Sequence, residues 1–385
     1  MPVIVVAGAG LAGLQTVVAL RAQGYDGRLT LLGAEPDPPY DRPPLTKALL
    51  LGQTDDTTLE ADWAALDVDL RLGARVTAVQ GRSLLTDAGE LAFDRCVLAT
   101  GAQPRRLPGA GTTLRTNADA LALRAALTPG ARLVVVGAGW IGAEVATAAV
   151  ARGAHVTVVE GLDRPLAGAL PAEIGSRTLP WWAAADLRLG ATVEAVEPDA
   201  VLLAGGERLP ADRVLVAIGA RPDVPEGPDL TPAGAAAVDP QLRTSLPDVW
   251  AVGDCAAWES ARYRTRMLVE HWDAALHGPT VVAANVLGGA EVWDPVPYFW
   301  SEQWGRMLQY AGHHPAGERV VWREDGDRWA AFWLAGDRLV AALTVDRPRD
   351  LVQARRMMQR DAAIDADRLA DPAVAVKDAV AGFQP

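Results

Sequence analysis

The chain of 385 residues contains only two cysteines, Cys96 and Cys255, which lie far apart in the sequence. No CxxC or CxxxxC pair is present, and this excludes the redox-active dithiol of disulfide reductases. We expect both cysteines to be buried and to behave as small hydrophobic residues. No metal site is predicted.

Lysine is nearly absent as well. Lys47 and Lys377 are the only lysines, beside 34 arginines. In so arginine-rich a chain, a lysine within a motif indicates a position that needs a compact primary amine.

The chain also lacks an excess of positive charge and a long apolar run. Its net charge of −12 argues against nucleic acid or an anionic membrane surface as a partner. No stretch reaches the roughly 18 consecutive apolar residues of a membrane span. The apolar segment at 3–20 lacks the positively charged start of a signal peptide. We therefore expect a cytoplasmic protein without membrane contact.

What the chain does contain is a glycine-rich turn that occurs twice, as VVAGAGLAG at 5–13 and VVVGAGWIG at 134–142. Each follows an apolar, β-branched run and opens an alanine-rich stretch suited to a helix. The first glycine permits a tight turn, the second lets a pyrophosphate approach the backbone, and the third lets helix and strand pack closely. The predicted binding residues are Gly8, Gly10, Leu11, Ala12 and Gly13, and in the second turn Gly137, Gly139, Trp140, Ile141 and Gly142. Two bound dinucleotides are expected, which indicates redox chemistry.

An acidic residue follows each turn. Glu160 comes 18 residues after Gly142, and Glu35 comes 22 residues after Gly13. A carboxylate in this place accepts hydrogen bonds from an adenosine ribose and repels a 2′-phosphate, so NADH is favoured over NADPH. Arg164 lies close enough in sequence to serve a phosphate instead, and either acid could be a solvated carboxylate at a strand end.

The repeat extends beyond the glycines, since VLATGAQP at 97–104 is similar to VLVAIGARP at 214–222. Strands that alternate with helices predict doubly wound parallel sheets, with the second unit inserted within or after the first. From about Asp294 aromatic residues and short alternating runs predict an α+β domain with a helix at about 348–360. We therefore predict a domain at 1–112 and 233–293, a second at 113–232, and a C-terminal α+β domain at 294–385.

Between the units lies PPYDRPPLTK at 38–47, in which four prolines fix the backbone. Such a segment presents Arg42 and Lys47 rigidly, or it is a stiffened surface loop.

Taken in order, the motifs GAGLAG, PYDRPPLTK, LATGAQPRRL, GAGWIGAE, AVGDCA, VEHW and PYFWSEQW make the chain resemble a known family. It is similar to the FAD-dependent, NADH-oxidising ferredoxin reductases of bacterial oxygenases and cytochromes P450, relatives of rubredoxin reductase and apoptosis-inducing factor. The resemblance covers essentially the whole chain. It implies two Rossmann-like domains and a C-terminal domain in a glutathione-reductase-like architecture, with FAD, NADH and a [2Fe–2S] ferredoxin partner. Monomer and homodimer both stay open.

The resemblance also implies five catalytic residues. Lys47 would lie with Arg42 beside the flavin ring, near its N5 edge, and Glu144 would pair with Lys47. Glu270, Trp272 and Trp300 would wall the flavin where the nicotinamide stacks. From composition alone, the two tryptophans would be ordinary core residues.

Further cofactor-binding residues follow from the same resemblance. The first glycine turn and Glu35 would bind the FAD pyrophosphate and adenosine. Asp254 would accept hydrogen bonds from the ribityl chain, and a helix after it would direct its N-terminus at the flavin. The remaining predicted residues are Val76, Ala99, Thr100, Gly101, Arg115, Gly219 and Gly253.

Two alternative functions stay open. The acceptor could be a quinone or another small molecule, or the protein could be an apoptosis-inducing-factor-like responder to NADH. On the helix at 348–360, Arg349, Arg356 and Arg360 share one face, which would attract an acidic ferredoxin or is simply solvated. The segment 176–190 is shorter than the family pattern, and Trp140 stands where phenylalanine is expected.

Overall fold

Each glycine-rich turn lies between a strand and a helix, as the sequence predicts. The computed structural model describes residues 1–381. In the first unit the order is β1 (Ile4–Ala7), α1 (Leu11–Ala22) and β2 (Leu29–Leu32); in the second it is β9 (Arg132–Val136), α5 (Trp140–Ala151) and β10 (His155–Glu160). The helices α1 and α5 begin and end 129 residues apart, so the duplication in sequence is a duplication in structure.

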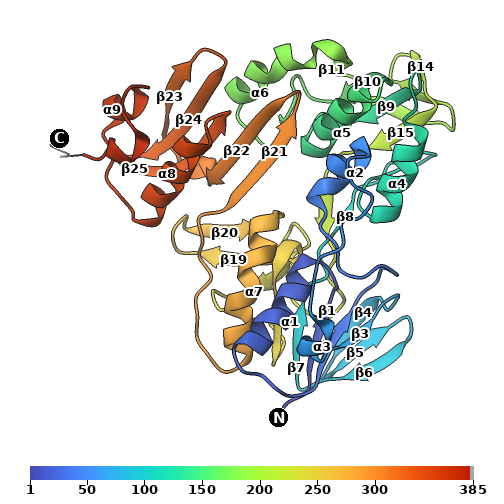
Figure 1. The fold of residues 1–385 in the computed structure, drawn as a ribbon, viewed down its shortest axis with the longest axis vertical. Helices are drawn as coiled ribbons and strands as arrows, with labels where there is room; N and C mark the ends of the chain where they lie inside the picture. Colours follow the sequence, from blue (N-terminus) through green and yellow to red (C-terminus); the bar gives the residue numbers. More distant parts are fainter. Residues whose placement is uncertain (382–385) are drawn as a thin grey trace.

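The first unit is built on a parallel sheet with the strand order β18-β7-β1-β2-β3. The other strands are β3 (Asp69–Arg71), β7 (Arg95–Leu98) and β18 (Val249–Ala251), of which β3 and β18 form the edges. Because β18 follows the whole second unit in the sequence, the second unit is inserted into the first. Two small sheets complete this part, one of β4 (Val76–Gln80), β5 (Ser83–Thr86) and β6 (Gly89–Ala92), the other of β17 (Ala236–Val238), β19 (Ala256–Ser260) and β20 (Thr265–Leu268). Helices α3 (Trp63–Leu66) and α7 (Trp272–Val286) also belong here, and α7 lies beside α1 (Figure 1).

The second unit has its own parallel sheet, in the order β11-β10-β9-β15. The added strands are β11 (Asp186–Leu189) and β15 (Arg213–Val216), and an antiparallel sheet of β12 (Val193–Val196), β13 (Ala200–Leu203) and β14 (Arg208–Pro210) lies next to them. Its other helices are α4 (Asn117–Ala126) and α6 (Ala172–Thr178). Where the chain passes between the units, β8 (Ala102–Pro104) and β16 (Ala220–Pro222) pair antiparallel. Two parallel doubly wound sheets confirm the predicted fold class.

The proline-rich segment crosses from the first unit to the second. It forms a 3₁₀ helix at Pro43–Thr46 and the short helix α2 (Ala48–Leu51). Leu45, Leu49 and Leu50 are buried in the apolar core of the second unit. Figure 1 accordingly shows the blue helix α2 beside α4 and α5 of the second unit, well away from β1 and β7 of the first. The segment is therefore a buried connection rather than a surface loop.

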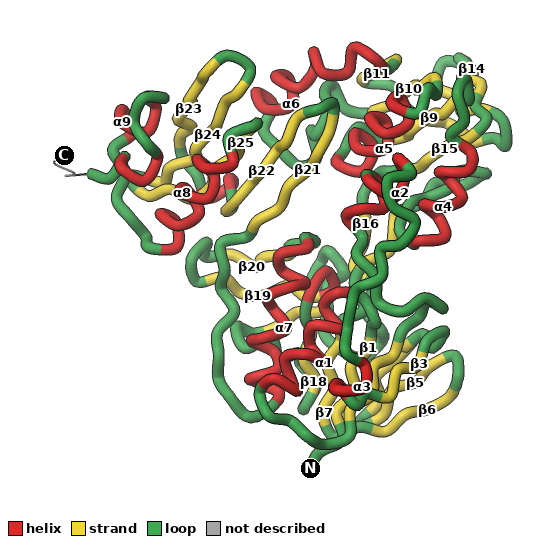
Figure 2. Tube along the Cα trace, in the orientation of Figure 1, coloured by secondary structure: helices red, strands yellow, loops and turns green. Residues whose placement is uncertain are grey.

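The C-terminal part is an antiparallel sheet in the order β21-β22-β25-β24-β23. The strands are β21 (Tyr298–Gln303), β22 (Arg306–Gly312), β23 (Arg319–Asp325), β24 (Arg328–Ala335) and β25 (Arg338–Val345), and the helices are α8 (Pro348–Gln359) and α9 (Ala366–Ala370). The helix α8 covers one face through Leu351, Ala354 and Met358. The opposite face packs against Leu170 and Ile174 of the second unit. Figure 2 shows the β21–β22 hairpin reaching toward that unit.

The two departures from the family pattern both lie against this hairpin. Trp182 is almost fully buried, and its ring lies 5.0 Å from that of Trp304 at the hairpin tip. Trp140 meets Phe299 edge-on at 4.8 Å. The tryptophans therefore fill the interface between the second unit and the C-terminal sheet.

Two expectations from composition can be compared with the fold. Cys96 and Cys255 are both buried and free, as predicted. In the part of the chain that the structure describes, no helix combines the length and the apolar character needed to cross a membrane.

Candidate active site

A cavity of about 1080 Å³ lies where the two units and the C-terminal sheet meet. Pockets for one ligand commonly measure about 300–1,000 Å³, so this cavity has room for more than one small cofactor fragment. Most of the predicted site residues line it: Gly8, Gly10, Leu11, Ala12, Glu35, Arg42, Lys47, Val76, Ala99, Thr100, Gly101, Arg115, Gly137, Gly139, Trp140, Ile141, Glu144, Glu160, Gly219, Asp254, Glu270, Trp272 and Trp300. The structure thus brings both glycine turns and the aromatic residues to one place.

The glycine turns form two matching cradles. Gly8 has a φ of +116°, and a Cβ there would lie 2.1 Å from the Ala99 carbonyl oxygen; Gly137 has a φ of +107°. At Gly10 and Gly139, by contrast, a Cβ would meet no atom within 4 Å, and both residues line the cavity. A side chain at these two positions would occupy the space in which a pyrophosphate approaches the backbone. The residues present therefore fit two dinucleotides.

Three predicted glycines do not line the cavity. A Cβ at Gly13 would lie 1.7 Å from the Gly8 carbonyl oxygen, and one at Gly142 would lie 1.9 Å from that of Gly137. Gly253 has a φ of +77° and packs near Ala12. These glycines act on the site indirectly, because they allow the turns to pack tightly.

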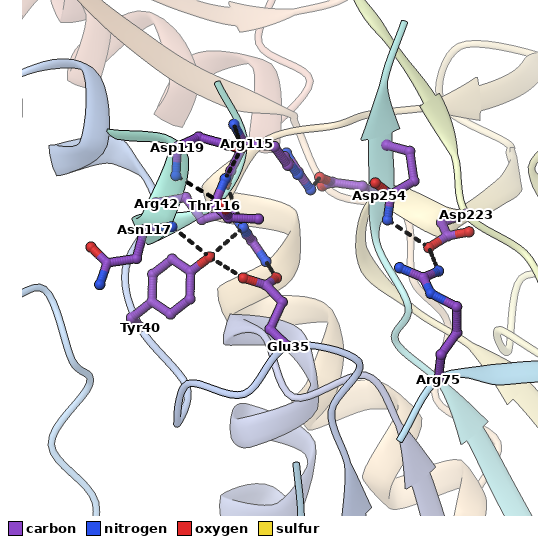
Figure 3. Close-up of polar contacts among 11 residues, drawn as sticks. Glu35, Tyr40, Arg42, Arg75, Arg115, Thr116, Asn117, Asp119, Asp223 and Asp254 are labelled. Carbon is purple, nitrogen blue, oxygen red and sulfur yellow. Dashed lines mark hydrogen bonds and ion pairs between the residues drawn. The ribbon is translucent and has the colours of Figure 1, made fainter. Parts of the chain in front are cut away.

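In the first unit, a network of charged and polar side chains surrounds Glu35, the acidic residue that follows the glycine turn (Figure 3). Arg42 donates from Nη2 to Glu35 Oε1 at 2.7 Å and from Nη1 to the Arg115 carbonyl at 2.6 Å. The Tyr40 hydroxyl donates to Glu35 Oε2, and burial raises the pKa of Tyr40, which keeps this hydroxyl protonated. Arg115 in turn pairs with Asp254 at 3.2 Å. The network thus places Arg42 with the acid Glu35.

Lys47 and Glu144 form the pair that the resemblance implies, with Nζ 2.6 Å from Oε2. The Glu144 side chain is only 5% exposed. Thr46 Oγ1 donates to the same carboxylate oxygen at 2.5 Å, and Ser301 Oγ donates to Oε1 at 2.7 Å. The Glu144 carboxylate, which belongs to α5, therefore accepts hydrogen bonds from the proline-rich segment and from the C-terminal strand β21.

Two tryptophans form an aromatic wall of the cavity. Trp272 and Trp300 meet edge-to-face with ring centroids 5.7 Å apart. Trp272 Nε1 donates to Asp41 Oδ1 at 2.7 Å, which fixes the indole; burial raises the pKa of Asp41, and this hydrogen bond opposes the rise. Rings held in this way can orient a flat ligand.

The residues before Trp272 are titratable groups in the same wall. Burial, helped by the nearby Asp254 carboxylate, raises the pKa of Glu270. His271 stacks on Phe299 at 4.3 Å, and burial lowers the pKa of His271 to about 4. His271 is therefore neutral at neutral pH.

In the second unit, the acid is held by backbone groups. Glu160 Oε2 accepts from the Ala138 N–H at 2.8 Å and Oε1 from the Leu162 N–H at 2.9 Å. Arg164 pairs with Asp163 and does not line the cavity. A ribose at this end would thus meet a carboxylate and no guanidinium from residue 164.

One sequence expectation was wrong. No helix follows Asp254 directly, because Gly253–Cys255 forms a 3₁₀ turn and the chain continues as β19. Pairing of β19 with β17 and β20 overrides the helical tendency of its alanines. The helix that starts at the cavity is instead α7, which begins at Trp272.

Sequence reasoning missed several cavity residues, among them Tyr40, Asp41, Thr46 and His271, and also Ser301, which bonds to the cavity residue Glu144. All five lie inside motifs that the sequence already showed, between the residues that attracted attention by charge or size. Their position within PYDRPPLTK, VEHW and PYFWSEQ is the signal that could have found them.

Comparison with known proteins extends over the whole chain. The family model for pyridine nucleotide-disulphide oxidoreductases matches residues 2–278, and the model for the reductase C-terminal domain matches residues 298–380. The ferredoxin–NAD(+) reductase component of the p-cumate 2,3-dioxygenase system of Pseudomonas putida is 36% identical over 395 residues, which cover 97% of this chain and 98% of that protein.

Two solved structures have the same fold. The crystal structure of Fdr9 matches with a TM-score of 0.93 and 47% identity, over 98% of this chain and 99% of that one. The crystal structure of a covalent putidaredoxin reductase–putidaredoxin complex matches with a TM-score of 0.92 and 32% identity, over 98% and 97%. The resemblance seen in the motifs is confirmed.

Proposed function

The chain belongs to the pyridine nucleotide-disulphide oxidoreductase family, and we propose that it is an FAD-dependent reductase that oxidises NADH and passes electrons to a [2Fe–2S] ferredoxin. That ferredoxin would serve an oxygenase or a cytochrome P450. The named relatives support this proposal, since one is a ferredoxin–NAD(+) reductase component and another was solved in complex with putidaredoxin. We propose the cytoplasm as its compartment, because NADH is available there.

The observation that carries the proposal is a single cavity with two glycine cradles. The first cradle would hold FAD with Glu35 and Asp254, and the second would hold NADH with Glu160. When bound, FAD accepts a hydride and returns the two electrons one at a time. Both cysteines are buried and free, so the electrons have no dithiol to pass through within this chain.

The residues between the cradles would prepare the transfer. Trp272 and Trp300 would orient the flat rings, and a hydride passes only between groups held close and face to face. Lys47 would place a positive charge beside the ring that gains negative charge, with Glu144 fixing the ammonium. Backbone N–H groups hold the Glu160 carboxylate at the second cradle, where it would meet the adenosine ribose, and we therefore propose NADH rather than NADPH as the reductant.

The experiment measures NADH oxidation by the FAD-loaded protein with a purified [2Fe–2S] ferredoxin as acceptor. We expect rapid transfer that weakens as salt is added, since an acidic ferredoxin would be attracted to exposed arginines such as Arg349 and Arg356 on α8 and Arg360 directly after it. Rapid NADH oxidation with a quinone as acceptor, together with no electron transfer to any ferredoxin, would overturn the proposed acceptor.

A further inference from the structure

We propose that Ser301 of the C-terminal sheet is a positioning residue for Lys47, acting through Glu144. The inference rests on the proposed function, in which the Lys47 ammonium faces the flavin. It assigns to the C-terminal sheet a direct part in arranging the reducing site, beyond the aromatic wall that Trp300 supplies.

The hydrogen bonds to Glu144 divide its two oxygens between different parts of the chain. Oε2 accepts from Lys47 Nζ at 2.6 Å and from Thr46 Oγ1 at 2.5 Å, whereas Oε1 accepts from Ser301 Oγ at 2.7 Å. An ionised carboxylate only accepts hydrogen bonds, so its orientation is set by the donors around it. Ser301 is the donor that holds Oε1 and thereby turns Oε2 toward Lys47.

A second residue fixes the direction of the serine hydroxyl. Gln303 Nε2 donates to Ser301 Oγ at 3.2 Å, and both side chains are 1% exposed. The hydroxyl has a single proton. Because Gln303 supplies a hydrogen to the oxygen of Ser301, that proton is left for Glu144.

The strand that carries Ser301 is fastened to the same helix as Glu144. The Trp304 N–H donates to Thr147 Oγ1 at 2.9 Å, three residues beyond Glu144 on α5, and the Trp304 ring packs on Trp182. At the other end of the strand, Phe299 packs on Trp140. Ser301 therefore stands between two anchored residues. Without its hydroxyl, Oε1 would be left in a buried place without this donor, and the carboxylate would turn away from Lys47.

The scarcity of lysine makes a direct test possible. In protein labelled with ¹³C at lysine Cε, only Lys47 and the exposed Lys377 give side-chain signals, so Lys377 serves as an internal reference. The FAD-loaded Ser301→Ala variant is compared with Ser301→Thr, which keeps a hydroxyl, and with Ser260→Ala. Ser260 is the matched control because it is also buried and donates to a carboxylate, that of Asp294, away from the cavity.

We expect Ser301→Ala to shift the Lys47 signal and leave Lys377 unchanged, with Ser301→Thr close to the unsubstituted protein and Ser260→Ala identical to it. Reduction of the FAD by saturating NADH should slow on the order of tenfold in Ser301→Ala, with KM for NADH unchanged, as a small misplacement near the reacting atoms implies. An unmoved Lys47 signal, or a shifted signal with an unchanged reduction rate, would overturn the proposal. If the unsubstituted protein oxidises no NADH, the proposed function fails by itself, and the Lys47 signal still decides whether Ser301 positions the lysine.

Discussion

The two glycine-rich units have nearly the same backbone but hold their acids in different ways. Gly8 and Gly137 share left-handed φ values of +116° and +107°. Glu35, however, is bound by the side chains of Tyr40 and Arg42, whereas Glu160 is bound by backbone N–H groups of its own unit. The glycine cradle is therefore duplicated, whereas the groups that bind the acidic residue beside it differ between the two units.

The residues that surround the two cradles also differ in charge and in exposure to solvent. The first is closed by segments from elsewhere in the chain, with Arg115 paired to Asp254 across it. The second is lined by Ile141, Leu162 and Ile218, whose exposed fractions are 40%, 51% and 36%. A cradle enclosed by paired charges suits a resident cofactor, and an open apolar one suits a ligand that must leave after each turnover. This contrast supports the proposal that FAD binds in the first unit and NADH in the second.

The strongest test of the contrast changes the link between the units. Lys47→Met removes the ammonium that joins the proline-rich segment to α5. We expect FAD content to stay unchanged and the rate of FAD reduction at saturating NADH to fall by about a hundredfold, as loss of one charge-stabilising donor typically does. Stopped-flow absorbance measures the rate. Lys377→Met, which changes the other lysine, is the control, and a normal rate in Lys47→Met would remove the proposed role.

A matched pair of substitutions then separates the cradles. At Gly10 and Gly139 an added Cβ meets no protein atom within 4 Å, so neither alanine substitution creates a clash within the protein. An inserted methyl in a tight contact costs about 1–3 kcal/mol, or roughly tenfold to a hundredfold in affinity. We expect Gly10→Ala to weaken FAD binding, and Gly139→Ala to keep FAD and raise KM for NADH. The reverse pattern would mean that the two units are exchanged.

A smaller effect is expected at the acid of the second unit. Glu160→Ala removes the carboxylate that we propose binds the ribose, and it should raise KM for NADH about tenfold, a common result of losing a hydrogen bond to a charged group. The FAD content, measured by absorbance after purification, should not change. Loss of FAD would contradict the assignment.

The smallest effect at neutral pH is expected for His271→Phe, which keeps the stacking on Phe299. The pKa of His271 is about 4 in the folded protein and 6.5 in the unfolded chain. Between these two pH values the unfolded chain binds a proton at His271 and the folded protein does not, so the free energy of unfolding decreases as the pH falls from 6.5 to about 4. The loss amounts to about 3 kcal/mol when complete. Urea unfolding at several pH values should show that the free energy of unfolding decreases less at acidic pH in the variant than in the unsubstituted protein. The same decrease in both proteins would contradict the neutral, buried state of His271.

The sequence predicts the parts of this molecule that have a local signature. Glycine spacing after an apolar run predicts both cradles. The acidic residue that follows the next strand predicts the places of Glu35 and Glu160 in the cavity. Each of these patterns lies within about thirty residues of sequence. The Lys47–Glu144 pair came from the resemblance alone. Residues 46, 144 and 301 meet through side chains from three separate segments, and no periodicity marks such contacts. The strand after Asp254 was missed for a different reason: its alanines favour a helix, and pairing with β17 and β20 overrides that local tendency.

The most direct measurement mixes the purified protein with NADH in the absence of oxygen and follows the flavin absorbance. A protein that holds FAD in one cradle and NADH in the other is yellow as purified and is bleached by NADH. A colourless protein that takes up no FAD on reconstitution would contradict the central claim, and so would a yellow one that NADH leaves unchanged.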